Sequence, residues 1–262
     1  MSAPHDHKLV PRPFVFGAAV TGESHVQLNT PCQDACAYEV FGSSAAFAVA
    51  DGLGSAKESD LGANIAVKAA VLEAGKLLAA PDAKPEEVAK ALVLASRAEL
   101  EKAAAAKSIP LSDLACTLIA GVIRGDTATV AHIGDGAVVI KTGEGLKVLS
   151  RPGDSEYVNE VVPLTSREFA RHLRVSGPVA GVLCLAAFTD GCQRASLVRS
   201  ADGLVPHEKF FAPIFDYALA EVADLSRAEA EIKALLASEK MGRVSDDDKT
   251  LVIAVLSGEA PK

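Results

Sequence analysis

The segment Ala45–Ser55 reads AAFAVADGLGS. Its first six residues are apolar without interruption, which is typical of a β-strand in a sheet that is covered on both faces. The strand runs directly into Asp51 and Gly52, a pair of residues that favours a tight turn. An aspartate therefore stands at the tip of a buried strand, and the rest of the chain repeats this arrangement.

Other apolar runs predict more strands of the same kind. The runs are Cys116–Ile123, Ala128–Ile133, Ala137–Ile140, Val182–Phe188 and Leu251–Leu256, with Phe14–Val20 and Ala35–Phe41 as weaker candidates. Helical spacing of apolar residues predicts helices over Asp60–Ala80 and Pro85–Ala106. A third helix is predicted over Ser226–Ser238, where Ser226 and Glu229 have the spacing of a capping box. Because strands and helices are segregated rather than strictly alternating, the pattern favours an α+β fold.

The composition limits the classes of partner. The chain has 262 residues, of which 49% are hydrophobic, and a formal net charge of −8 at pH 7. That much apolar sequence excludes a disordered chain. An acidic chain does not attract nucleic acids or anionic membranes, and no apolar run approaches the roughly 18 residues of a membrane-spanning helix. We expect no nucleic-acid or membrane partner, and we predict a flexible tail over residues 1–13 followed by one domain over residues 14–258.

The cysteines indicate a reduced protein. The five residues, Cys32, Cys36, Cys116, Cys184 and Cys192, lack the paired spacing of a zinc site. Cys32 and Cys36 leave a redox pair open as an alternative to free thiols. The N-terminal stretch lacks the apolar segment of a secretory signal. A cytoplasmic protein is the simplest expectation.

Aspartates stand at the ends of several predicted strands. Besides Asp51, they are Asp34, Asp135, Asp190 and the run Asp246–Asp248. Taken singly, each is explained by a turn, and Asp135 with Gly136 has hairpin spacing between two short strands. Taken together, carboxylates that converge on one end of a sheet would repel one another unless a cation lay among them. An all-oxygen site of this kind selects Mg²⁺ or Mn²⁺ rather than zinc.

Other common chemistries lack their motifs. The sequence has no phosphate-binding loop ending in Gly-Lys-Ser or Gly-Lys-Thr, no dinucleotide-binding fingerprint and no Gly-x-Ser-x-Gly nucleophile elbow. A site built on carboxylates is therefore the leading hypothesis.

Six short segments follow one another along nearly the whole chain. The segments are Asn29–Ala35, Val49–Ser55, Ala115–Leu118, His132–Asp135, Thr189–Gly191 and Asp247–Thr250. In this order they resemble the motifs of the metal-dependent type 2C protein serine/threonine phosphatases: Asn-Glu-Asp-Ala, Asp-Gly-x-Gly-Gly, Gly-Thr-Thr-Leu, Val-Gly-Asp, Ser-Asp-Gly and Asp-Asn-x-Thr. Each motif is weak alone, but the ordered series makes the resemblance specific.

The resemblance implies a fold and a metal centre. The fold would be two antiparallel sheets packed face to face and flanked by helix pairs, an αββα sandwich. The centre would hold two Mn²⁺ or Mg²⁺ ions, with Asp51 bridging them and Gly52 ligating through its carbonyl. The positions that match metal ligands are Asp34, Asp51, Gly52, Asp190, Asp247 and, for a third ion that some bacterial members carry, Asp113. Asp51 and Asp190 are also the implied catalytic residues.

The sequence departs from the family where phosphate is bound. An arginine that grips the phosphate is replaced by His25, which supplies a positive charge only when protonated. The glutamate of the opening motif is Gln33, and the arginine that follows the Val-Gly-Asp motif is missing. Gly153–Glu160 resembles a variant of a divergent bacterial branch. We therefore assign phosphate recognition to His25, with Lys57 or the metals as the alternatives.

The resemblance implies a phosphoprotein phosphatase. It would hydrolyse phosphoserine or phosphothreonine with a metal-bridged hydroxide, so that no protein nucleophile is required. Its partner would be a phosphorylated protein, the product of a serine/threonine kinase. The alternative is a catalytically weak relative that binds metal and a phosphorylated protein as a regulator. A phosphatase for a small metabolite and a purely structural domain with Asp-Gly turns also stay open.

Overall fold

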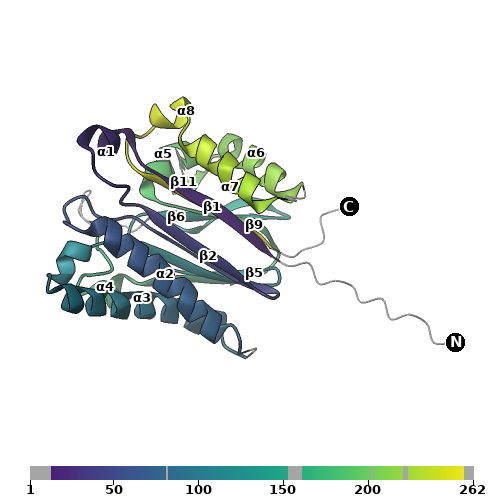
Figure 1. Ribbon diagram of the computed structural model, residues 1–262. Coiled ribbons are helices and arrows are strands. Elements are labelled where there is room, and N and C mark those ends of the chain that lie inside the picture. Colours follow the sequence, from purple (N-terminus) through teal and green to yellow (C-terminus); the bar gives the residue numbers. More distant parts are fainter. Residues whose placement is uncertain (1–12, 81, 153–160, 202, 221–223, 257–262) are drawn as a thin grey trace.

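The structure is a computed structural model that describes residues 13–80, 82–152, 161–201, 203–220 and 224–256. Two five-stranded antiparallel sheets lie face to face, and helices cover the outer face of each sheet (Figure 1). The expected αββα sandwich is therefore confirmed. The predicted tail falls almost wholly outside the described residues, as does Gly153–Glu160, and the single domain over residues 14–258 stays a prediction. Among the described residues, no helix is long and apolar enough to cross a lipid bilayer.

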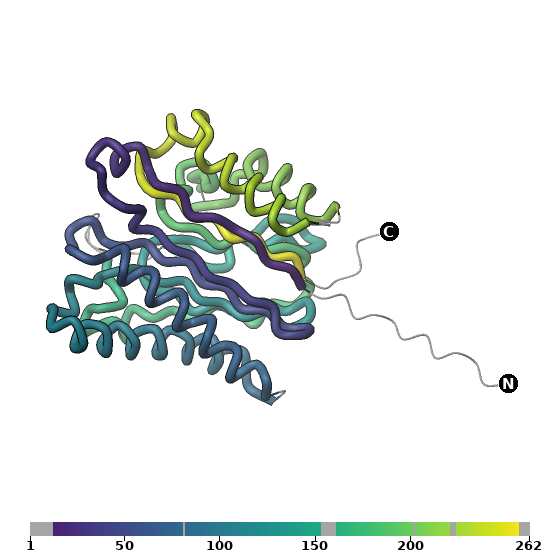
Figure 2. Tube along the Cα trace, viewed as in Figure 1, coloured from purple at the N-terminus to yellow at the C-terminus, as the bar shows by residue number. Residues whose placement is uncertain are grey.

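Sheet I has the strand order β1-β12-β9-β6-β7. Its strands are β1 (Phe14–Val20), β6 (Ala137–Thr142), β7 (Gly145–Ser150), β9 (Val182–Phe188) and β12 (Lys249–Val255). β1 and β12 come from opposite ends of the chain and lie side by side (Figure 2). Their pairing is antiparallel, from Phe14 with Val255 to Val20 with Lys249. The first and last strands of the described chain are therefore neighbours at this side of sheet I.

Sheet II has the strand order β2-β3-β4-β5-β8. Its strands are β2 (Ala35–Phe41), β3 (Ser44–Ala50), β4 (Leu118–Arg124), β5 (Thr127–Ile133) and β8 (Arg174–Val179). A separate small hairpin joins β10 (Leu197–Ser200) to β11 (Gly203–Pro206). All eight strand segments predicted from apolar runs are present, with ends that differ by at most two residues.

Helices form the outer layers. The long pair α2 (Ser59–Leu77) and α3 (Pro85–Lys107) covers sheet II, and α6 (Glu208–Leu219) with α7 (Leu225–Leu236) covers sheet I (Figure 1). The short elements are α1 (Glu23–Leu28), η1 (Leu111–Leu114), α4 (Phe169–His172), η2 (Asp190–Cys192), α5 (Gln193–Ser196) and α8 (Glu239–Gly242).

Apolar side chains fill three layers. The layer between the sheets includes Phe47, Val49, Ile119 and Leu185. A second layer packs sheet II against α2 and α3, and a third packs sheet I against α6 and α7. Because the chain has no tryptophan and only 9 Phe and 3 Tyr, small aliphatic residues fill most of this volume. Such side chains let the helices approach the sheets closely.

The strand register brings many strand ends to one edge of the sandwich. In sheet II, Ala35 at the start of β2 pairs with Ala50 at the end of β3. In sheet I, Phe188 at the end of β9 pairs with Ala137 at the start of β6 and with Leu251 near the start of β12. Antiparallel neighbours begin and end alternately. The aspartates that follow β3 and β9 therefore arrive at the same edge as those that precede β2 and β12.

The predicted hairpin at Asp135 and Gly136 is wrong. β5 ends at Ile133 in sheet II and β6 begins at Ala137 in sheet I, so the residues between them cross from one sheet to the other. Packed sheets lie about 10 Å apart, a gap that a connection of this length spans. Spacing alone does not distinguish this crossing from a turn.

The predicted capping box of the third helix is also wrong. The capping residue is Asp224, whose side chain accepts a hydrogen bond from the Arg227 backbone N–H at 3.2 Å. Glu229 accepts a hydrogen bond from the Tyr38 hydroxyl at 2.5 Å instead of returning to Ser226. A carboxylate at the start of a helix accepts hydrogen bonds from the free N–H groups, and its negative charge interacts favourably with the positive end of the helix dipole.

One long helix is not predicted from the sequence at all. α6 contains Pro213 in its interior, and such a proline normally breaks a helical pattern. Its exposed position and the strongly apolar segment around it allow the helix to continue.

Phe47→Ala tests the layer between the sheets. Phe47 is fully buried, so we expect the free energy of unfolding to fall by about 3–5 kcal/mol because a cavity remains. Leu72→Ala is the matched control, because Leu72 on α2 is 67% exposed. This variant should change the free energy of unfolding by less than about 1 kcal/mol. Urea denaturation measures both. Equal losses in the two variants would contradict the inter-sheet role of Phe47.

Candidate functional site

Aspartates gather at the edge of the sandwich. They are Asp34, Asp51, Asp135, Asp190 and Asp247, which we call the aspartate cluster. Burial raises the pKa of Asp51, and the negative charges of the other four carboxylates raise it further. The structure therefore brings together every predicted aspartate ligand except Asp113, and it adds Asp135.

Asp34 is fixed by two threonines from sheet I. It precedes β2 and is buried, and its Oδ2 accepts hydrogen bonds from the hydroxyls of Thr189 at 2.7 Å and Thr250 at 2.8 Å. Thr250 also donates its backbone N–H to the Thr189 hydroxyl at 3.0 Å. Burial raises the pKa of Asp34, and Asp248 and Asp190 add to the rise, while the two threonine hydrogen bonds oppose it. These bonds join the two sheets at the site.

Asp51 is fixed by Thr117 from the neighbouring strand segment. The Thr117 hydroxyl accepts from the Asp51 N–H at 3.0 Å, and the Thr117 N–H donates to the Asp51 carbonyl at 2.8 Å. The next residue, Gly52, donates its N–H to the Gln33 carbonyl at 3.0 Å. A Cβ on Gly52 would lie 2.8 Å from that oxygen and 2.7 Å from the Ser59 carbonyl oxygen. Only glycine fits this close approach, so the turn is part of the site's construction.

Asp190 reaches the cluster just after the end of β9, and Asp247 just before the start of β12. Burial raises the pKa of Asp190 to about 6, with Asp135 and Asp247 contributing. Asp247 is exposed, and its Oδ1 accepts from the Asp248 backbone N–H at 2.8 Å. Gly191 packs so tightly on the Asp248 carbonyl that a Cβ there would overlap it. The two loops are thus held against each other.

Asp135 is the cluster member that sequence analysis left at a turn. Burial raises its pKa, Asp247 adds to the rise, and Arg174 lowers it. Among the described residues, nothing donates a hydrogen bond to its buried Oδ1. The match of His132–Asp135 to a family motif could have identified Asp135 as a site residue. The interpretation of Asp135 as part of a hairpin turn left it out of the predicted ligands.

Two cations lie beside the cluster. Arg174, the first residue of β8, donates to the Gly134 carbonyl at 2.9 Å and is close enough to lower the pKa of Asp135. Lys249 is buried at the start of β12 and donates its ammonium group to the Asp247 carbonyl at 2.6 Å. Neither was singled out from the sequence, because β8 was not predicted and Lys249 was assigned to a motif's variable position.

His25 is paired with a buried carboxylate. Its Nδ1 lies 2.8 Å from Asp248 Oδ2, and because a carboxylate accepts, Nδ1 is the donor. Asp248 also accepts from the backbone N–H groups of Gly22 at 2.7 Å and Gln33 at 2.6 Å. Asp248 stands where the family motif resembled above has asparagine. Two of the departures from the family pattern, His25 and Asp248, therefore contact each other.

Two predicted candidates have no described contact with the cluster. Asp113 lies in η1, and its carbonyl accepts from the Glu58 N–H at 2.8 Å. It is not among the carboxylates that raise the pKa of Asp51. Lys57, the alternative phosphate ligand, is exposed.

The cluster suits a hard divalent cation. Its donors are all carboxylate or carbonyl oxygens, its charges repel one another, and Asp135 keeps a buried oxygen without a donor. As the side chains stand, no three acidic, histidine or cysteine residues in the described part of the chain are arranged to hold an ion. Binding an ion would therefore require the carboxylates to draw together.

Cys32 and Cys36 are not joined by a disulfide in the structure. Cys32 and Cys36 are both free thiols, and burial raises the pKa of each to about 12. A protonated thiol is a poor nucleophile.

Known proteins are similar to this chain in sequence and in fold. The family described as Protein phosphatase 2C matches residues 21–237. Over 245 residues the chain is 32% identical to Serine/threonine-protein phosphatase 3 of Escherichia coli (strain K12), an alignment that covers 91% of this chain and 96% of that protein.

Solved structures show the same fold at low identity. A bacterial serine phosphatase has a TM-score of 0.62 and 11% identity, covering 94% of this chain and 99% of that chain. A second structure is the catalytic domain of the serine threonine protein phosphatase PstP in complex with 2 manganese ions. Its TM-score is 0.59 at 16% identity, and the match covers 93% of this chain and 97% of that chain.

The sandwich and its carboxylate edge define the class of metal-dependent phosphatases. The match over residues 21–237 and the identity to the Escherichia coli protein are decisive for the family. The chain belongs to the protein phosphatase 2C family.

Stability without metal should fall as pH rises. Burial and repulsion raise the folded pKa values of Asp34, Asp51 and Asp190 above the ordinary value of 3.8, so the folded state binds more protons than the unfolded state. The free energy of unfolding is then highest near pH 4 and declines through about 6, the pKa of Asp190, and beyond. Asp51→Asn should flatten this decline and raise the melting temperature in chelator near neutral pH by about 2–4 °C.

The control is Asp82→Asn, at an exposed position outside the cluster. Melting curves at several pH values, with chelator and with Mn²⁺, should show that Mn²⁺ stabilises the wild type and Asp82→Asn more than Asp51→Asn. A melting temperature of Asp51→Asn below that of the wild type at neutral pH in chelator would refute the repulsion.

Proposed function

We propose that this chain hydrolyses phosphoserine and phosphothreonine in proteins, using Mn²⁺ or Mg²⁺ held by the aspartate cluster. The observation that carries the proposal is the convergence of Asp51 with Asp34, Asp135, Asp190 and Asp247 at one partly buried edge. Membership of the protein phosphatase 2C family supports it. When bound, the divalent ions lower the pKa of a coordinated water and neutralise phosphoryl charge.

The proposed ligands are Asp34, Asp51, Asp190, Asp247 and the Gly52 carbonyl, with Asp51 shared between two ions. Asp135 joins them as a candidate, and Asp113 is retained only for a third ion. Thr189 and Thr250 would orient the Asp34 carboxylate, and Thr117 would hold the backbone from which the Asp51 carboxylate extends. The chain needs no covalent nucleophile for this reaction.

His25 is the proposed group for orienting the phosphate. Its ring is held through Nδ1 by Asp248, so Nε2 is the atom left for a phosphate oxygen. A single nitrogen grips one oxygen, whereas an arginine would grip two. Arg174 and Lys249 supply further positive charge beside the cluster.

The regulatory alternative is not favoured. A relative without catalysis would be expected to lose carboxylates, whereas every aspartate of the six motifs is present. The relative with 32% identity is itself named a phosphatase.

The setting of the reaction is also proposed. We place the enzyme in the cytoplasm, acting on the products of a serine/threonine kinase in a signalling pathway. The five free thiols support a reducing compartment.

Turnover should depend strictly on added metal. We expect hydrolysis of an aryl phosphate and of a phosphothreonine peptide with Mn²⁺ or Mg²⁺, and none after exhaustive chelation. Asp190→Asn should lower turnover by about two orders of magnitude while the melting temperature stays near or above that of the wild type. Asp82→Asn is the control. Undiminished activity in chelator would refute the metal mechanism.

His25 variants should separate recognition from chemistry. His25→Ala should raise the Michaelis constant for a phosphopeptide with a smaller effect on kcat, as expected for lost ground-state binding. His25→Arg should lower this constant, since a guanidinium can hold two phosphate oxygens where the one free imidazole nitrogen holds one. The control is His172→Ala, at an exposed position on α4. Identical kinetics for wild type, His25→Ala and His25→Arg across the pH range would exclude this role.

A further inference from the structure

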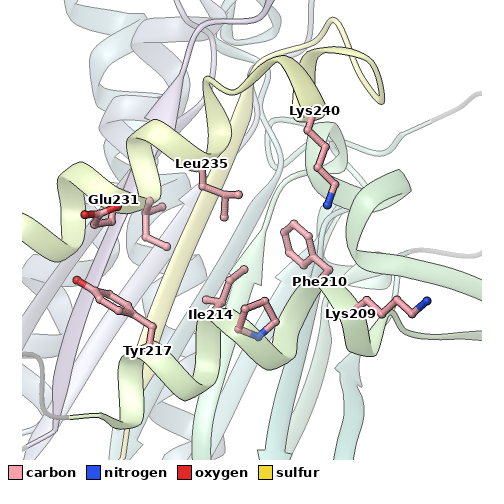
Figure 3. A pocket seen from close by; sticks show the side chains of 9 residues that line it. Lys209, Phe210, Ile214, Tyr217, Glu231, Leu235 and Lys240 are labelled. Atoms are coloured by element: carbon pink, nitrogen blue, oxygen red, sulfur yellow. The ribbon is translucent and has the colours of Figure 1, made fainter.

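A groove runs between α6 and α7 on the outside of sheet I. Its volume is about 230 Å³. Its walls consist of Lys209, Phe210, Pro213, Ile214 and Tyr217 from α6, Glu231, Ile232 and Leu235 from α7, and Lys240 from α8 (Figure 3). None of these residues belongs to the aspartate cluster, so the reaction does not account for the groove.

The α6 wall is a helical stripe. Phe210, Pro213, Ile214 and Tyr217 are spaced i, i+3, i+4 and i+7, which puts them on one face over about two turns, or roughly 10 Å. Pro213 and Tyr217 are exposed, the latter by 38%, whereas Ile214 forms a buried floor. Such a stripe is the surface onto which another helix packs.

The two ends of the groove differ in charge. Lys240 extends over Phe210 at one end, whereas the hydroxyl of Tyr217 points toward Glu231 at the other (Figure 3). Lys209 stands at the lysine end, although its ammonium group points outward (Figure 3). Neither lysine has an ion pair within the described residues, on a chain whose net charge is −8. The lysine end therefore fits an acidic group.

The size of the groove favours side chains over a small molecule. Sites for drug-sized ligands usually measure about 300–1,000 Å³, which is larger than this groove. A few apolar side chains from a larger partner would fill it. An amphipathic helix presents such anchors at i, i+3 or i+4, and i+7, which is the spacing of the stripe on α6.

We propose that the groove between α6 and α7 binds an amphipathic helix of a partner protein. The apolar face of that helix would lie on Phe210, Ile214 and Leu235, and its acidic end would lie at Lys240. The proposal does not depend on phosphatase activity, because no groove residue belongs to the cluster. Binding and turnover are therefore separable.

The test selects a helix without assuming its sequence. A display library of helical peptides of about 14 residues is selected against the full-length chain. We expect the selected peptides to share apolar residues at i, i+3 or i+4, and i+7, with Asp or Glu at one end. The tightest peptide is then measured by fluorescence anisotropy on the wild type and on variants.

Lys240→Glu should raise the dissociation constant of this peptide by roughly fivefold to tenfold, and Tyr217→Ala should raise it severalfold. The matched control is Lys233→Glu, an exposed α7 position outside the groove, which should leave binding unchanged. All three variants should keep the wild-type melting temperature and the wild-type turnover of an aryl phosphate.

Three outcomes would overturn the proposal. One is a set of selected peptides without the apolar spacing and acidic end. Another is equal weakening by Lys240→Glu and Lys233→Glu. The third is a different occupant: self-association of the chain in sedimentation that Lys240→Glu abolishes, or binding of decanoate, but of no library peptide, in a Lys240-dependent manner.

Discussion

Repulsion between like charges at one edge of the sandwich is the constraint on which the site depends. Carboxylates come to this edge from the ends of β3 and β9 and from the starts of β2 and β12, and they raise one another's pKa values. Buried negative charges of this density cost stability unless protons or cations neutralise them. The fold tolerates them because the layers on either side are closely packed and supply the stability that the edge lacks. Stability and metal binding are therefore linked in this protein.

The supports around the aspartate cluster are as specific as the carboxylates themselves. Thr189 and Thr250 hold Asp34 across the gap between the sheets, and Gly52 lets the Asp51 turn pass close to neighbouring carbonyl groups. His25 is likewise held by a specific partner, Asp248. An arginine would need free space and a bidentate target, whereas a smaller imidazole needs a partner to fix its plane. The buried Asp248 carboxylate provides that partner.

The sequence predicted the buried strands well and the exposed elements poorly. Continuous apolar runs identify β3, β9 and β12, because both faces of those strands are covered. β8 has no buried residue and so gives no apolar run, and Pro213 stands in the interior of α6, where a proline normally argues against a helix although the apolar spacing around it is helical. Most of the aspartate cluster followed from the ordered motifs, but the contact of His25 with Asp248 joins residues far apart in the chain. Such contacts depend on strand register, which local patterns do not encode.

The architecture separates chemistry from partner binding. The cluster lies where strand ends meet, and contacts from both sheets hold its residues. The helices over sheet I have one buried face, and their outer surface is free to acquire other uses. Phe210 and Leu235 illustrate the division, because each packs against the core beneath and still lines the groove above. A binding surface of this kind can change its specificity through Lys240 or Tyr217 without disturbing the carboxylates, since neither side chain contributes to the edge of the sandwich.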